Sequence, residues 1–73
     1  MDRATVEDRL AQAERYVAEG EEHIAQQRDL VTRIEREGHD TTSALFLLSQ
    51  FEEMQVMHVA ARERLRGELA ALG

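Results

Sequence analysis

The first half of the chain repeats apolar residues, with one glycine and one glutamine among them, at alternating spacings of four and three. The repeat runs through Val6, Leu10, Ala13, Val17, Gly20, Ile24, Gln27, Val31 and Ile34. A seven-residue repeat of this kind places one narrow stripe on a single face of a helix. Asp2 or Thr5 suits the start of that helix, and Gly38 suits its end. The pattern predicts a first helix over about residues 3–37.

The second half of the chain is apolar over more than one face. On a helical wheel, ten residues gather on one broad side: Ala44, Leu47, Leu48, Phe51, Met54, His58, Ala61, Leu65, Leu69 and Leu72. Five more lie outside that arc: Leu45, Phe46, Val56, Met57 and Ala60. Because Asp40 is a good N-cap residue, we expect a second helix over about residues 41–70.

Residues 38–40 remain as a short connection between the two predicted helices. So short a connection makes consecutive helices fold back antiparallel. The predicted fold class is therefore all-α, an antiparallel helical hairpin that forms a single domain over residues 1–73. The alternative is one continuous helix through Gly38. The expected hairpin core comprises Leu10, Val17, Ile24, Val31, Leu48, Phe51, Met54, His58, Leu65 and Leu69.

The hairpin also predicts which residues face one another. If the turn is centred on its middle residue, Ala13 faces Leu65 and Gly20 faces His58. A glycine inside a helix costs about 1 kcal/mol relative to alanine. The need for room beside the imidazole ring of His58 would explain why a glycine occupies position 20.

Several apolar side chains of the second helix have no partner within a hairpin. Burying a large apolar side chain yields about 1.5 to 3 kcal/mol. Leu45, Phe46, Val56 and Met57 therefore leave on the order of 10 kcal/mol unrealised in an isolated hairpin. That sum rivals the whole stability of a small domain. We therefore expect a homodimer that forms a four-helix bundle through a surface of Leu45, Phe46, Val56, Met57 and Ala60.

Composition narrows the classes of function. The 73-residue chain has no cysteine and no proline, and fifteen acidic against nine basic residues give a net charge of −6. An acidic chain without a basic cluster is a poor partner for nucleic acid. No segment has the ~20 apolar residues that span a membrane, and no charged leader precedes an apolar run. We expect a cytoplasmic protein that binds neither nucleic acid nor membrane.

Candidate chemistry is sparse. Glu19 and His23 have an i, i+4 spacing that can hold one metal ion, but the i, i+3 glutamate and histidine pairing of di-iron bundles is missing. We expect His58 in the core, held by Gln55 or Gln27, and no cofactor. The two glutamines either fix the helix pairing from core positions or only reach water at its edge. No activated nucleophile or phosphate-binding loop is evident, so no enzymatic activity is expected.

Two segments of the chain resemble a known group of proteins. AERYVAEGEEHIAQQRDLVTRIEREGHDTTSA, residues 13–44, and FEEMQVMHVAARERLRGEL, residues 51–69, are similar to short uncharacterised two-helix proteins of alphaproteobacteria. In those proteins a break like residues 38–41 separates two helices, and a histidine like His58 is typical. The resemblance implies a helical hairpin in a bacterial cytoplasm and implies no activity.

Taken together, these features favour a non-enzymatic, self-associating helical interaction module with an accessory or regulatory role. One alternative is an adaptor that captures a helix of a different protein, because exposed methionines repack around varied partners. A second alternative is a metal-binding helical bundle that uses His58 and nearby acidic residues.

Overall fold

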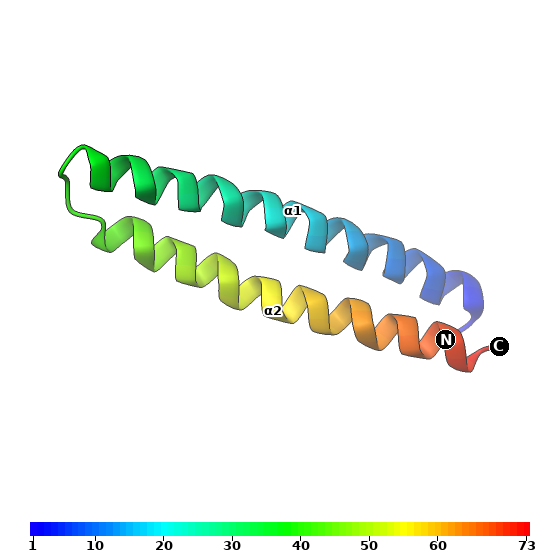
Figure 1. Ribbon diagram of the computed structural model, residues 1–73. Coiled ribbons are helices and arrows are strands. Elements are labelled where there is room, and N and C mark those ends of the chain that lie inside the picture. Colours follow the sequence, from blue (N-terminus) through cyan, green and yellow to red (C-terminus); the bar gives the residue numbers. More distant parts are fainter.

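The computed structural model describes residues 1–73 as two antiparallel helices (Figure 1). Helix α1 spans Arg3–Arg36 and helix α2 spans Thr42–Ala71, with no strand. The Cα trace measures 55 × 14 × 13 Å, and both chain ends lie at the end opposite the turn. The predicted hairpin is confirmed, and the single continuous helix is wrong. Neither helix combines the length and the apolarity that crossing a membrane requires.

Backbone hydrogen bonds at Gly38 end α1. The Gly38 N–H donates to the Glu35 carbonyl at 3.0 Å, and the His39 N–H donates to the Ile34 carbonyl at 3.1 Å. This pair of bonds forms a Schellman motif, which needs left-handed backbone at the residue after the C-cap. Gly38 supplies it with φ of 76°. Glycine tolerates this conformation because it has no Cβ, so the sequence-based prediction for Gly38 is confirmed.

Aspartates accept hydrogen bonds at both helix starts. Asp2 is the N-cap of α1: the Thr5 N–H donates to Asp2 Oδ1 at 2.8 Å, and this bond lowers the pKa of the Asp2 carboxyl. At α2, the Thr42 hydroxyl and N–H donate to Asp40 Oδ1 at 2.7 and 3.0 Å. Those two bonds lower the pKa of Asp40. The N-cap of α2 is Thr41 and not Asp40 as predicted, so the helix begins at Thr42, one residue later than expected.

The predicted stripe on α1 faces α2 along its whole length. All nine of its residues are buried or half-buried. The buried set of the hairpin is small and consists of Val6, Ala13, Val17, Gln27, Val31 and Leu65. Ala13 and Leu65 belong to one cluster, as the expected helix pairing requires. Six buried residues make a thin core, which leaves much apolar surface outside it.

The stripe on α2 differs from the prediction at its centre. The α2 residues that face α1 include Ala44, Leu48, Phe51, Gln55, His58, Arg62, Leu65 and Leu69, again spaced by four and three. Met54 is 53% exposed, so its assignment to the hairpin core is wrong, and Leu47 is exposed as well. Two coiled helices contact every 3.5 residues and not every 3.6. Over two turns this difference replaces Met54 with Gln55.

The other predicted core residues lie where expected. Val17, Val31 and Leu65 are buried. The remaining six are half-buried: Leu10, Ile24, Leu48, Phe51, His58 and Leu69.

Candidate interaction surfaces

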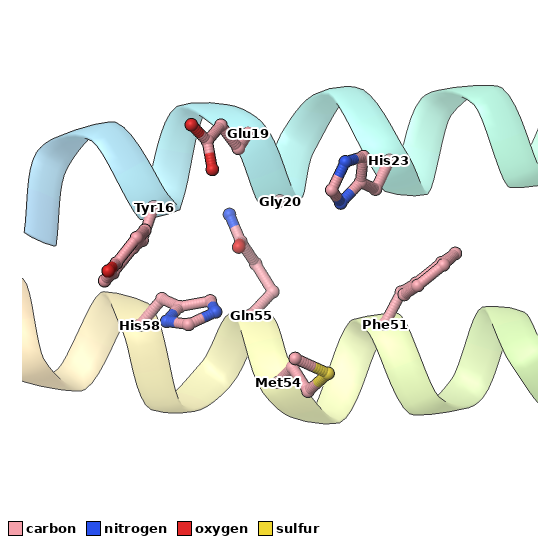
Figure 2. A pocket seen from close by; sticks show the side chains of 8 residues that line it. All are labelled: Tyr16, Glu19, Gly20, His23, Phe51, Met54, Gln55 and His58. Atoms are coloured by element: carbon pink, nitrogen blue, oxygen red, sulfur yellow. The ribbon is translucent and has the colours of Figure 1, made fainter.

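The centre of the hairpin is built around Gln55 and Gly20. Gln55 extends from α2 toward Gly20 (Figure 2), and its Nε2 donates to the Val17 carbonyl at 2.9 Å. A Cβ at position 20 would overlap the Gln55 amide, whose Cδ lies 2.7 Å from the Cβ position. The prediction that His58 fills the space at Gly20 is therefore wrong, although the pairing of Ala13 with Leu65 holds. Gly20 makes room for a glutamine amide and not for an imidazole ring.

Gln27 makes the reciprocal bond from the other helix. Its side chain is buried, and its Nε2 donates to the Ala44 carbonyl of α2 at 2.9 Å. Each helix thus sends one glutamine to a backbone carbonyl of the other. Of the two interpretations of these glutamines, the one in which they fix the helix pairing is supported. The Gln55 Oε1 atom is buried without a hydrogen-bond partner, so the pairing is polar at its centre.

Aromatic rings line one side of the helix contact, which we call the aromatic flank. Tyr16 lies against His58 with ring centroids 5.5 Å apart, and His23 lies against Phe51 at 5.7 Å. The two ring pairs stand on either side of Gln55 (Figure 2). Between them lies a groove of ≈ 370 Å³, with Met54 on its α2 wall. No hydrogen bond joins His58 to a glutamine, so the expectation that Gln55 or Gln27 holds His58 is wrong.

Ion pairs span the opposite side of the helix contact, which we call the charged flank. Arg28 lies 3.7 Å from Glu52, and Arg66 lies 3.7 Å from Glu14. All four side chains are about half exposed, so each pair contributes little to stability. The two flanks of one hairpin therefore differ in chemistry, one aromatic and one ionic.

The five residues of the predicted interaction surface do not share one face. All are exposed, with Phe46 at 65%, Val56 at 70% and Met57 at 71%. Met57 lies one turn from Met54 and adjoins the aromatic flank, whereas Leu45 and Val56 lie toward the charged flank. Phe46 and Ala60 occupy the outer side of α2. Whether these residues contact another chain remains a prediction.

Metal-binding geometry is not assembled within one chain. No group of three or more histidine, aspartate or glutamate side chains converges on a common point. His23 and Glu19 both line the aromatic groove, together with His58. The imidazole rings of His23 and His58 and the carboxylate of Glu19 come from separate helical turns. His23 faces Phe51, and His58 faces Tyr16.

Sequence analysis missed Tyr16 as a surface residue. Tyr16 is 43% exposed, and its hydroxyl accepts a hydrogen bond from Gln12 Nε2 at 2.9 Å. The signal was present in the repeat, because Tyr16, His23 and Leu30 follow one another at seven-residue spacing beside the α1 stripe. Residues at that spacing line one side of a coiled-helix contact. The repeat of Tyr16, His23 and Leu30 therefore predicts which α1 residues line the aromatic flank.

Comparisons with known proteins identify no relative of this chain. No protein family, no curated protein and no solved structure matches the chain. The resemblance to short alphaproteobacterial two-helix proteins stays a prediction.

Proposed function

We propose that this chain is a non-enzymatic, self-associating helical module whose hairpins pair into a four-helix bundle. The observation that carries the proposal is the exposed apolar surface of a hairpin with a thin core. Leu45, Phe46, Leu47, Met54, Val56 and Met57, all on α2, are exposed. A monomeric soluble protein seldom leaves so many large apolar side chains on one element without a partner.

The energetics favour association. Tyr16, Leu47, Met54 and Met57 are each about half exposed or more. If burial of the exposed part of each side chain yields roughly 1 kcal/mol, four of them on each of two chains contribute on the order of 8 kcal/mol. The full sum of about 8 kcal/mol would correspond to a dissociation constant of about 1 μM. The translational and rotational freedom lost on association costs about 4 kcal/mol or more, which moves the dissociation constant upward from that value toward about 1 mM. The charge of −6 per chain opposes pairing, but salt screens exposed charges beyond about 8 Å.

We place this module in the cytoplasm of a bacterium, with an accessory or regulatory role. The lack of cysteine is compatible with a reducing compartment, where disulfides are rare. The proposal involves neither nucleic acid nor a membrane surface. Its net acidity supports this, because phosphate groups of both would repel the chain.

A second candidate function is the capture of a helix from a different protein. Exposed Met54 and Met57 support this candidate, because methionine side chains adapt to varied apolar surfaces. A captured helix would occupy the same surface as a second hairpin. The two functions therefore differ in what the pure protein does alone.

Sedimentation equilibrium of the pure chain tests the proposal. We expect the average mass to rise from one chain of 8.4 kDa toward twice that value as concentration passes through the micromolar range. A dissociation constant of about 1 mM corresponds to a binding free energy of only about 4 kcal/mol. If the average mass stays at that of one chain up to a protein concentration of about 1 mM, self-association is refuted and helix capture is favoured.

A further inference from the structure

We propose that a second copy of this chain docks on the aromatic flank of the hairpin, and that the charged flank stays exposed to solvent. This inference rests on the proposed self-association and adds where it takes place. Sequence analysis placed the contact on five residues around α2, whereas the structure distinguishes two flanks that involve both helices.

Charge is the first reason to choose the aromatic flank. The seven-residue repeats that contain Tyr16 in α1 and Met54 in α2, together with the outer repeats next to them, carry three arginines against Asp2 and three glutamates over the two helices and the ends of α1, a net charge of −1. The arginines and glutamates are Arg9, Arg33, Arg64, Glu19, Glu37 and Glu68. A surface that meets a copy of itself must not strongly repel itself. The aromatic flank comes close to this condition although the chain as a whole carries −6.

The charged flank fails the same condition. The corresponding repeats on that side carry six glutamates against the two arginines Arg28 and Arg66, a net charge of −4. The glutamates are Glu7, Glu14, Glu21, Glu35, Glu52 and Glu63. Both arginines are already paired within the hairpin. Glu7 and Glu63 are also paired, with Arg3 and Arg62, so Glu21 and Glu35 remain without an ion pair. Two such flanks brought together would oppose four uncompensated negative charges, and like-charge contacts disfavour association.

Shape is the second reason. The groove beside Gly20 is continued toward the turn by a further hollow lined by Gln26, Leu30 and Arg33, and both hollows share His23 and Phe51. The charged flank has a single hollow, of ≈ 380 Å³, between Arg28, Glu52 and Val56. The aromatic flank is therefore recessed over a longer stretch of helix. A recess between two helices accepts side chains of another helix, and the exposed Met54 and Met57 of a second copy are flexible enough to fill it.

The available area suits a dimer. The Cα trace is 55 Å long and 14 Å wide, so the projected outline of one face, about 770 Å², has room for an interface of the standard size of about 800 Å² per partner. A single foreign helix would cover only part of this width. A second hairpin of the same dimensions covers all of it.

Thiol protection tests the choice of flank with two variants of the cysteine-free chain. Met54→Cys places a thiol on the aromatic flank, and Val56→Cys places one toward the charged flank, two residues away on the same exposed helix surface. Both substitutions introduce small apolar side chains and leave the helix contact untouched. Alkylation rates are measured with maleimide at protein concentrations below and above the midpoint of dimerisation.

We expect the alkylation rate at position 54 to fall by about tenfold or more upon dimerisation, as burial in a stable interface implies, and the rate at position 56 to stay within about twofold. Protection at position 56 alone, or equal rates at both positions in a chain that does dimerise, would overturn the choice of flank and leave self-association intact. A wild-type chain that stays monomeric in sedimentation would instead refute the proposed function.

Charged substitutions provide a second, independent readout. Met54→Glu appears twice in a two-fold dimer, and each buried glutamate costs about tenfold or more, so the dimer dissociation constant should rise about 100-fold. Val56→Glu should change it by less than about threefold. Helix content from circular dichroism verifies that both variants fold, because both side chains are exposed in the hairpin. The reverse order of effects would contradict the proposal.

Discussion

The contact between Gln55 and Gly20 predicts that substitutions at the two positions are strongly coupled. In the wild-type chain, Gly20→Ala places a Cβ on the Gln55 amide and forces it away from the Val17 carbonyl. In a Gln55→Ala chain the amide atoms that this Cβ would overlap are removed. A double-mutant cycle over Gly20→Ala and Gln55→Ala therefore isolates this one contact.

The magnitudes follow from two competing effects. Alanine within a helix is favoured over glycine by about 1 kcal/mol, and loss of the Gln55 hydrogen bond costs about 1 kcal/mol. We expect Gly20→Ala to change the free energy of unfolding by about zero in the wild-type chain and to raise it by about 1 kcal/mol in the Gln55→Ala chain. Gln55→Ala alone should cost less than about 1 kcal/mol, because it also removes the buried Oε1 that lacks a partner.

Urea unfolding followed by circular dichroism measures all four variants. Protein concentration must be equal throughout, since the stability of a self-associating chain depends on it. The expected coupling is about 1 kcal/mol, well above the 0.3 to 0.5 kcal/mol that independent sites show. If Gly20→Ala stabilises both backgrounds equally, Gln55 does not occupy the space beside Gly20 and the helix pairing described above is incorrect.

Three further outcomes are expected. Gly38→Ala should lower the free energy of unfolding by about 1 to 2 kcal/mol in urea titrations, because its φ of 76° is left-handed, and Gly38→Asn should cost less. Leu65→Ala should cost about 2 to 5 kcal/mol by the same assay, since Leu65 is buried among Val6 and Ala13; a loss below 1 kcal/mol would contradict that packing. The pKa values of Asp2 and Asp40 are lowered from 3.8, so their stabilisation is complete above 3.8 and is lost as pH falls through the lower folded values. The urea midpoint should decline in that acidic range, and less so for Asp40→Asn, which accepts hydrogen bonds without titrating.

The first helix was predictable from sequence because its repeat is unbroken from Val6 to Ile34. Every position of that stripe faces α2, and the turn at Gly38 follows from the backbone freedom of glycine. The second helix was harder, because polar residues occupy the centre of its stripe. Gln55 and Arg62 look like surface residues, and only the continuation of the four and three spacing from Leu48 places them against α1.

The helix pairing could not be fixed from sequence alone. Sequence spacing along two antiparallel helices predicts the register only to within a few residues. Ala13 lies with Leu65 as expected, but the side chain beside Gly20 is Gln55 and not His58, one turn away. The side chain of Gln55 decides the matter, since it reaches along the groove to the Val17 carbonyl. The two flanks were likewise hidden, because they combine residues from both helices and depend on the pairing.

The glutamine bridges have a consequence for the turn. Gln55 binds the Val17 carbonyl near the middle of α1, whereas Gln27 binds the Ala44 carbonyl in the first turn of α2. Gly20 is the one position in the α1 stripe without a Cβ for Gln55 to meet. The alignment of the two helices is thus fixed by side chains at mid-length as well as beside the connection that joins them. Lengthening that connection should only add loop entropy, which grows slowly with length, while the helices keep their partners. The hairpin is therefore a scaffold whose loop can vary in length and sequence without shifting either flank.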